Sequence, residues 1–403
     1  MAKRLLRTLA PEQLRGRRVL VRADLNVPLD GDTVTDETRI RASLPTLEYL
    51  AGAGARVILM SHLGRPKGSP DPASSLAPVA QRLAALSPVP VHFVADTVGD
   101  EARSAAAALP EGEILLLENT RFLPGETEDD PSLGGAMAAL GDLYVNDAFG
   151  SAHRAHASTA GVARAVKASG GLAVAGLLME RELSFLGDAL DNPERPFVAI
   201  LGGAKISGKI DVVEALLPRV DQLLIGGAMA NTFLLALGLP VGGSLVEDDR
   251  VDMARELMER AGERLLLPVD CRVSHRLAAD AEARVVARDG VGDGEVIGDI
   301  GPETEGLFRE AVRGARTILW NGPMGVFEMA PFAHGTLAVA RAVAEATDAG
   351  ATSVLGGGDS AAAAEVAGVT HRLTHVSTGG GASLEFLAGA ELPGVAVLSD
   401  QEG

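Results

Sequence analysis

The sequence predicts an α/β protein made of two similar-sized Rossmann-like domains with parallel sheets, joined by an interdomain helix. Short apolar runs alternate with alanine-rich amphipathic stretches, which is typical of buried parallel strands separated by helices. A chain of 403 residues with 47% apolar side chains is long enough for more than one core. Residues 176–190 carry apolar side chains at helical spacing without a strand signal, which predicts the joining helix.

The predicted elements follow from these runs in chain order. In the first half the expected strands are residues 19–27, 57–61, 114–119 and 143–147. In the second half they are residues 197–201, 223–225, 265–269, 317–320 and 353–355. Amphipathic stretches at residues 78–86, 252–261 and 336–346 predict intervening helices.

Charge and composition exclude several classes of function. The net charge of −18 and the aromatic content of 3% argue against binding to nucleic acid or to an anionic membrane. Residues 1–180 are nevertheless nearly neutral, with 18 Lys and Arg against 21 Asp and Glu, so basic clusters there could bind an anion. Cys271 is the single cysteine, which excludes an intramolecular disulfide. The short apolar stretch near the start and the lack of any membrane-length run predict a cytoplasmic protein.

Two glycine clusters predict a phosphate-binding region in the second half. Gly356, Gly357 and Gly358 follow an apolar run, and Asp359 and Ser360 then open an alanine-rich helix. Uncovered backbone N–H groups beside a helix start favour an anion, and a carboxylate there suggests Mg²⁺ between it and phosphate. A second cluster at residues 379–381 again precedes a helix. Tight turns without a ligand remain an equally weighted interpretation of glycine clusters alone.

Cationic and polar side chains gather where the predicted strands of the first half end. Ligands of open α/β sheets bind outside these carboxyl ends, and arginine matches phosphate and carboxylate with two parallel hydrogen bonds. Any one arginine could simply neutralise a surface carboxylate, but several at strand ends of one domain favour binding of a small, highly anionic substrate. The residues concerned are Asp24, Asn26, His62, Arg22, Arg39, Arg65, Arg121 and Arg154.

The strand ends of the second half carry glycines and lysines, which suit a nucleotide. Lys205 follows a buried strand and a glycine pair, where it could neutralise a transferring phosphoryl group. Residues 203–209 also fit G-x-x-x-x-G-K, yet Ile210 stands where a P-loop has Ser or Thr. Glu328 lies among glycines and apolar residues, where it could accept hydrogen bonds from a ribose or could simply be a helix-start carboxylate.

Ten segments together closely resemble the phosphoglycerate kinase family. They occur in the family's order between residues 18 and 387, which makes the series far more specific than any single motif. The segments are RVLVRADLNVPL, ETRIRASLPTLEYL, SHLGRPKG, LLLENTRFLPGE, YVNDAFGSAHRAHAST, FVAILGGAKISGKI, LLIGGAMANTF, LWNGPMGVFE, VLGGGDSAAA and STGGGASLEFL.

The resemblance implies two domains with separate ligands. Residues 1–175 would bind 3-phosphoglycerate or 1,3-bisphosphoglycerate, residues 176–386 would bind ADP or ATP with Mg²⁺, and residues 387–403 would pack back on the first domain. The implied phosphoglycerate ligands are Asp24, Asn26, Arg39, His62, Arg65, Arg121 and Arg154. The implied nucleotide ligands are Lys205, Lys209, Glu328, Gly356, Gly357, Gly358, Asp359 and Ser360, with Asp359 contacting Mg²⁺. Arg39, Lys205 and the Gly379 and Gly380 amides would stabilise the phosphoryl group in transfer.

Four positions depart from the family's usual pattern. Leu25 stands where Phe is expected, Gly208 replaces Asp, and Ala228 and Asn231 replace the commoner Gly and Tyr. None of these changes removes a charged group assigned to chemistry.

The resemblance therefore predicts a monomeric glycolytic kinase that transfers a phosphoryl group reversibly between 1,3-bisphosphoglycerate and ADP. No obvious general base accompanies the predicted cations, which fits a carboxylate acceptor that needs no deprotonation. Two alternatives are a P-loop-like NTPase that uses residues 203–209 and a non-catalytic nucleotide- or anion-binding protein.

Overall fold

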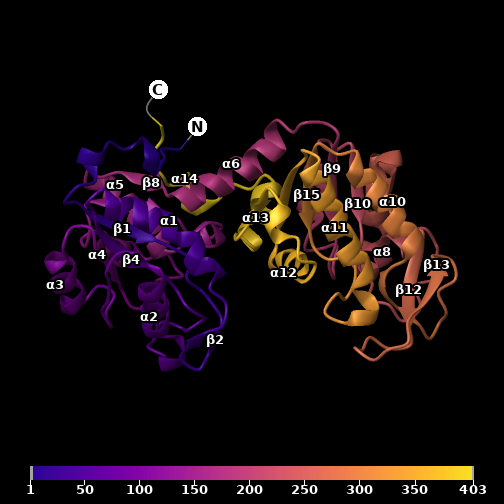
Figure 1. Cartoon of the computed structure of the whole chain (residues 1–403), viewed down its shortest axis with the longest axis horizontal. Helices are drawn as coiled ribbons and strands as arrows, with labels where there is room; N and C mark the ends of the chain where they lie inside the picture. The colour runs from indigo at the N-terminus through magenta and orange to yellow at the C-terminus, as the bar shows by residue number, and fades with distance from the viewer. Residues whose placement is uncertain (1–2, 402–403) are drawn as a thin grey trace. The chain divides into compact units, whose positions relative to one another are not determined.

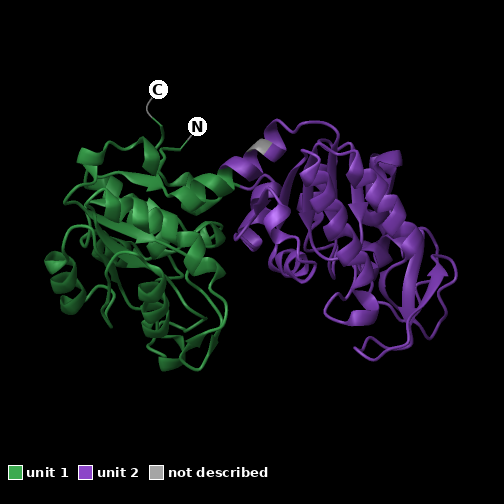
Figure 2. Ribbon diagram, in the orientation of Figure 1, with its two compact units in different colours: residues 1–183, 391–403 green, residues 184–390 purple. Residues whose placement is uncertain are grey.

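The chain folds into two compact units in a computed structural model that describes residues 3–401, except for the side chain at position 188. Unit 1 comprises residues 1–183 and 391–403, and unit 2 comprises residues 184–390 (Figure 2). The units divide within helix α6 (Leu177–Asp191), whereas the sequence-based boundary lies at its start, between residues 175 and 176. The binding roles assigned to the two halves remain predictions.

Unit 1 contains a six-stranded sheet in the order β5-β6-β4-β1-β7-β8, and all of its pairings are parallel. Figure 1 labels β1, β4 and β8 of this sheet. The central strand β1 ends at Arg22, so the predicted strand 19–27 was too long by five residues. Residues 23–27 instead leave the sheet as a loop that carries Asp24 and Asn26. The strands are β1 (Arg18–Arg22), β4 (Arg56–Met60), β5 (Val91–Phe93), β6 (Ile114–Leu116), β7 (Leu143–Asn146) and β8 (Ala173–Ala175).

Alternate side chains of these strands supply the core of unit 1. Val19 and Val21 of β1 are fully buried in one apolar cluster with Ile40 and Leu47 of helix α1 and Leu83 of helix α2. Strands such as β4 and β6 are buried and mostly apolar because both faces of a parallel sheet are covered, which is why the sequence predicted them. The strands β5 and β8 were not predicted. The helices are α1 (Thr38–Gly52), α2 (Ala77–Leu86), α3 (Asp100–Ala108), α4 (Pro131–Ala138) and α5 (Val162–Ala168), and a short hairpin joins β2 (Leu29–Asp30) to β3 (Thr33–Val34).

Unit 2 repeats this plan with a second parallel sheet in the order β11-β10-β9-β15-β16-β17. Trp320 of β15 is fully buried, and it packs in one cluster with Phe308 of α10 and Val343 of α11. The strands are β9 (Phe197–Leu201), β10 (Gln222–Ile225), β11 (Leu265–Leu266), β15 (Thr317–Asn321), β16 (Thr352–Gly356) and β17 (His375–Val376). The helices are α7 (Ile210–Leu216), α8 (Met229–Ala236), α9 (Val251–Ala261), α10 (Pro302–Arg313), α11 (His334–Asp348), α12 (Gly358–Val366) and α13 (Gly381–Leu387). These two sheets confirm the predicted fold class.

A three-stranded antiparallel sheet in unit 2 was not predicted. Strand β12 (Asp270–Ser274) lies between β13 (Arg284–Ala287) and β14 (Val296–Ile300). These strands interleave charged and apolar residues, so they lack the continuous apolar run on which the prediction relied. Residues of β12 and β14 line one side of the pocket described below.

The C-terminal segment packs within unit 1. Its helix α14 (Pro393–Ala396) is followed by Ser399, whose N–H donates to Ala173 O of β8 and whose O accepts from Arg4 N–H, each at 2.8 Å. Asn146 Nδ2 donates to Gly394 O at 2.8 Å. In the described part of the chain, no helix is both long enough and apolar enough to cross a membrane.

Asp147 gives the start of α6 a pH-dependent stability. The side chain is fully buried, and its Oδ1 accepts the N–H groups of Leu178 at 2.9 Å and Met179 at 3.2 Å. Burial raises the pKa of this carboxyl to about 6, against a usual value of 3.8. Between these values the folded chain binds more protons than the unfolded chain, so the contribution of Asp147 to stability falls as pH rises from about 4 to about 6.

The substitution Asp147→Asn should remove this dependence. Relative to wild type, the variant should gain about 2.4 kcal/mol between pH 4 and pH 7, from 1.36 kcal/mol per pKa unit. Urea unfolding followed by circular dichroism at several pH values measures the gain. Fluorescence of Trp320, buried in unit 2, serves as an internal reference. A difference between variant and wild type that stays constant with pH would contradict this assignment.

Candidate active site

Each parallel sheet has one point where the strand order reverses direction. In unit 1 the chain moves outward through β4 on one side of β1 and through β7 and β8 on the other. In unit 2 it moves through β10 and β11 on one side of β9 and through β15, β16 and β17 on the other. Ligands of open α/β sheets bind at the carboxyl ends of the strands beside such a point. The predicted site residues follow these strands in both units.

After the end of β1, two ligand candidates make hydrogen bonds with neighbouring residues. Arg39 Nη1 donates to Asp24 Oδ1 at 2.8 Å, and about one-third of the Arg39 side chain stays exposed. Asn26 accepts the N–H of Gly64 through its Oδ1 at 2.8 Å. Asn26 thus fixes the turn before Arg65, while Asp24 orients the Arg39 guanidinium.

Arg22, the last residue of β1, makes buried contacts at this edge of the sheet. It is fully buried, donates to Ser158 Oγ at 2.8 Å and lies 3.0 Å from His62 Nδ1 through its Nη2. Burial, followed by the charges of Arg22, Arg121 and Arg39, holds the pKa of His62 well below 6.5. His62 is therefore neutral, and its Nδ1 accepts a hydrogen bond from Arg22 instead of accepting a proton from a substrate.

Three predicted arginines line one pocket of about 580 Å³ in unit 1. Arg65 and Arg154 are exposed, whereas Arg121 is half-buried and donates to Gly64 O at 2.6 Å. Burial, Arg22 and Arg154 lower the pKa of Arg121 from its usual value. These cations repel one another, so an anion that binds in the pocket would be stabilised by them. Lys67 also lines it, as do Glu126 and Glu128.

In unit 2, Lys209 spans the point where the strand order reverses. Its Nζ donates to Gly202 O at 2.6 Å and to Asn321 O at 2.9 Å, and these two carbonyls end the neighbouring strands β9 and β15. Lys205, by contrast, is exposed in the loop after β9. The structure thus gives the two predicted lysines different environments.

The segment Gly356–Ser360, called the Gly356–Ser360 loop here, covers the end of β16, the joining residue Gly357 and the first turn of α12. Gly357 has a φ of +90°, and a Cβ there would lie 3.2 Å from Asn321 Nδ2, so a residue with a side chain would be strained. Ser360 is fully buried and accepts the N–H of Gly322 at 2.6 Å, which holds two loops together. Asp359 is exposed in the first turn of α12. The hydroxyl of Ser360 thus supports the loop.

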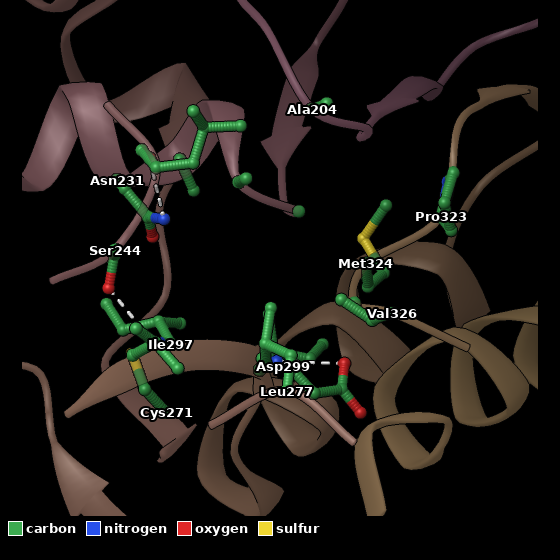
Figure 3. Close-up of a pocket in the computed structure, with 18 of the residues that line it drawn as sticks. Ala204, Asn231, Ser244, Cys271, Leu277, Ile297, Asp299, Pro323, Met324 and Val326 are labelled. Atoms are coloured by element: carbon green, nitrogen blue, oxygen red, sulfur yellow. Dashed lines mark hydrogen bonds between the residues drawn. The ribbon is translucent and has the colours of Figure 1, made fainter. Parts of the chain in front are cut away.

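A pocket of about 560 Å³ opens beside these loops (Figure 3). Figure 3 shows Asn231, Ser244 and Ile297 along one wall, with Met324 and Val326 across from them. The exposed carboxylates of Glu328 and Asp359 also line the pocket, as do Gly203 and Gly227. An apolar cavity of this size with a few polar groups suits a flat organic ligand.

The second glycine cluster precedes α13. Gly380 has a φ of +53° and is the residue before the first turn of this helix. The N–H of Gly379 donates to Ser377 Oγ at 3.1 Å. A ligand that uses the Gly379 amide would have to replace this hydrogen bond.

Burial lowers the pKa of Lys209 from 10.5 to about 8, against the opposing charge of Asp359. In the ligand-free protein, Lys209 therefore loses its charge as pH rises through 8. An anionic phosphate favours the charged form, so the affinity for MgADP, the ligand that the resemblance implies, should fall by up to about tenfold per pH unit above pH 8.

Calorimetric titration with MgADP between pH 7 and pH 9.5 measures this effect. Lys209→Arg keeps its charge throughout this range and should show a flat profile. The same loss of affinity in the Lys209→Arg variant would assign the titration to another group. The free energy of unfolding should change in the opposite sense. It should rise between pH 8 and pH 10.5, because in this range the unfolded chain binds more protons than the folded chain.

Comparison with known proteins identifies the family. Residues 9–390 match the family model described as phosphoglycerate kinase. The chain belongs to the phosphoglycerate kinase family. It is therefore a kinase, and neither an NTPase nor a non-catalytic binding protein is favoured.

Individual relatives match over nearly the whole chain. The phosphoglycerate kinase of Chlorobium limicola is 54% identical over 98% of this chain and 99% of its own length. That of Moorella thermoacetica is 56% identical over 98% and 99%. Among solved structures, phosphoglycerate kinase from Coxiella burnetii matches with a TM-score of 0.87 and 44% identity, covering 98% of each chain. The enzyme from Pyrococcus horikoshii matches with a TM-score of 0.84 and 34% identity, again over 98% of each chain.

Some residues beside the sites were not assigned a binding role from the sequence. Asn321 lies at the end of β15, and among residues 3–401 its Nδ2 has no hydrogen-bond partner. It faces Gly356 and Gly357, close to the candidate phosphate loop. Lys67 lies in the unit 1 pocket. The rule that ligands bind at strand ends points to Asn321, whereas Lys67 lies further along the loop after β4, close to Arg65.

Proposed function

We propose that the chain transfers a phosphoryl group reversibly between the carboxyl group of 1,3-bisphosphoglycerate and ADP, giving 3-phosphoglycerate and ATP. The observation that carries this proposal is the contrast between the two sites. The unit 1 site is cationic and suits a small anion, while the unit 2 site combines glycine loops with an apolar pocket and suits a nucleotide.

The phosphoglycerate would bind in unit 1. Arg65, Arg121 and Arg154 would bind its phosphate and carboxylate groups. Neutral His62, whose Nδ1 already accepts from Arg22, would donate a hydrogen bond through its Nε2–H. Asn26 would act mainly by holding the turn that carries Arg65. Asp24 would act by orienting Arg39.

The nucleotide would bind in unit 2. Its base would enter the apolar pocket, and Glu328 at the pocket wall would accept hydrogen bonds from the ribose. The phosphates would approach Lys209 and the N–H groups of the Gly356–Gly358 loop at the start of α12. Buried Ser360 would hold this loop in position.

Magnesium fits the residues at this loop. Mg²⁺ in kinases is usually held by one or two carboxylates together with substrate phosphates and water, and Asp359 supplies one exposed carboxylate. No group of three or more His, Cys, Asp or Glu able to hold a metal occurs within residues 3–401, so the phosphates would complete the coordination. When bound, Mg²⁺ would neutralise charge on the nucleotide phosphates.

Transfer would depend on positioning and charge neutralisation. The transition state spreads negative charge over three oxygens of the transferred group. Arg39, Lys205 and the amides of Gly379 and Gly380 would stabilise that charge. A carboxylate acceptor is already an anion, so the reaction needs no general base.

The test is phosphorylation of 3-phosphoglycerate by ATP, coupled to glyceraldehyde-3-phosphate dehydrogenase and followed as loss of NADH. The proposal predicts NADH loss that requires both the acceptor and Mg²⁺. Phosphate release from ATP without the acceptor would instead indicate an NTPase, and no activity in either assay would indicate a binding protein. Elution as a single chain in size-exclusion chromatography would support the predicted monomer.

A further inference from the structure

We propose that Glu247 is a positioning residue for the transfer step. Its carboxylate holds the loop of residues 203–209, and this loop carries Lys205. The inference rests on the proposed function, in which Lys205 stabilises the transferred phosphoryl group. It adds a residue that acts through Lys205 and does not touch the substrate.

Glu247 accepts two hydrogen bonds from one residue of the loop. The N–H of Ser207 donates to Glu247 Oε2 at 3.1 Å, and the Ser207 hydroxyl donates to Oε1. Partial burial would raise the pKa of Glu247, but hydrogen bonds from Ser207 and the backbone of Ile206, together with the charge of Lys205, hold this pKa below the usual 4.5. Glu247 is therefore an anion at neutral pH, and hydrogen bonds to an anion are stronger than those between neutral groups.

The segment that carries Glu247 is itself anchored to a buried helix. The N–H of Glu247 donates to Thr232 Oγ1 at 3.2 Å, and Asn231 Nδ2 donates to Leu245 O at 3.1 Å. Thr232 and Asn231 lie on α8, and each is 1% exposed. Because the segment is fixed at two points, a carboxylate on it can restrain a neighbouring loop.

The restraint falls on the stretch of the loop that carries Lys205. At one end of the loop, Gly203 O accepts a backbone N–H of α8 at 3.0 Å. Towards the other end, the N–H of Lys209 donates to Ile206 O at 2.8 Å. Lys205 lies between these two contacts and is exposed. The hydrogen bonds to Glu247 therefore limit the backbone conformations available beside Lys205.

Gly208 increases the importance of this contact. It departs from the family pattern, and a Cβ added there would meet no atom within 4 Å. Glycine also loses more conformational freedom on folding than any other residue. A loop with glycine at this position needs an anchor elsewhere, and the contact between Ser207 and Glu247 supplies one.

The contact also explains why the G-x-x-x-x-G-K match of residues 203–209 is not a P-loop. In a P-loop, backbone N–H groups of the glycine-rich segment point at phosphate. Here the N–H of Ser207 points at the carboxylate of Glu247. An internal anion thus occupies a donor that a phosphate would otherwise use.

Removal of the carboxylate should slow transfer without weakening nucleotide binding. Glu247→Ala should lower kcat in the coupled assay by about 5- to 30-fold, less than Lys205→Ala does, because the ammonium group is still present. The dissociation constant of MgADP should stay within about twofold, because Lys209 keeps its own carbonyl partners. Glu247→Gln still accepts a hydrogen bond and should restore part of the rate.

A double variant separates positioning from an independent effect. If Glu247 acts through Lys205, the kcat of Glu247→Ala/Lys205→Ala should equal that of Lys205→Ala within about twofold. Ser207→Ala removes the partner hydroxyl from an exposed position and should reproduce part of the Glu247→Ala loss. Asp248→Ala is the matched control, because Asp248 is the exposed carboxylate next in the chain, and its kcat should stay within about twofold of wild type.

Hydrogen exchange tests the restraint without any activity measurement. Mass spectrometry of peptides that cover residues 203–209 should show amide exchange about tenfold faster in Glu247→Ala than in wild type, because the Ser207 N–H loses its acceptor. Exchange in Asp248→Ala should match that of wild type.

Three results would overturn the proposal. They are unchanged exchange in Glu247→Ala, a loss of MgADP affinity that accounts for its whole effect, and a double variant whose loss is the product of the two single losses. A wild-type chain that phosphorylates no 3-phosphoglycerate would overturn the proposed function and the link to kcat, while the exchange measurement would still decide whether Glu247 holds the loop.

Discussion

Arg39→Ala should lower kcat by about 10²- to 10³-fold, with only a small rise in the KM for 3-phosphoglycerate. Arg39 keeps about one-third of its side chain exposed while Asp24 holds one of its nitrogens. The remaining N–H groups of the guanidinium can therefore be directed at charge that develops during transfer. Binding of the ground-state substrate would rest mainly on Arg65, Arg121 and Arg154.

Two control variants sharpen the Arg39 measurement. Arg41 lies on the same helix and pairs with Glu37 at 2.7 Å on the exposed surface, so Arg41→Ala should leave kcat within about twofold of wild type. Arg39→Lys keeps the charge without the planar fork and should restore only part of the rate. A large rise in KM at unchanged kcat for Arg39→Ala would make Arg39 a binding residue only.

Lys205→Ala should also lower kcat by about 10²- to 10³-fold, while the affinity for MgADP changes little. Lys205 is exposed in the loop after β9, so its ammonium group can move to the transferred phosphoryl group. Lys209 donates hydrogen bonds to Gly202 O and Asn321 O. Its removal should mainly weaken nucleotide binding and destabilise the structure around these two carbonyl groups.

The Lys205 prediction is checked by measuring kcat and the dissociation constant of MgADP separately. Arg260→Ala is the matched control, because Arg260 is a cation of unit 2 that pairs with Glu214 on the exposed surface. It should leave both quantities unchanged within about twofold. A loss of MgADP affinity large enough to account for the whole effect of Lys205→Ala would place Lys205 among the nucleotide-holding residues.

The sequence predicted most strands of the two central sheets because these strands are buried on both faces. It did not predict β5, which is only partly buried, or β8. Strand β9 is apolar along its whole length, and β15 is fully buried with an apolar centre, so both stand out from the amphipathic helices. The strands of the antiparallel sheet do not, because β12 and β14 include residues such as Asp270 and Asp299. The two-residue strand β17 is too short to give a pattern.

The candidate site was predictable in position but not in detail. The carboxyl ends of parallel strands meet at one edge, so sequence position alone gathers Asp24, His62 and Arg121. The hydrogen bonds among such residues depend on segments that approach only in the fold. Ser360 is joined to Gly322 across 38 residues, and Lys209 to Asn321 across 112. No local pattern in the sequence carries this information.

The central claim is that the acceptor is a carboxylate, and trapping of the product tests it most directly. The purified protein is incubated with MgATP, 3-phosphoglycerate and hydroxylamine, which converts an acyl phosphate into a hydroxamate. The account predicts hydroxamate formed in equal amount to ADP, and none when 3-phosphoglycerate is omitted. ADP formed without hydroxamate would contradict it, because the phosphoryl group would then have gone to water or to a hydroxyl group.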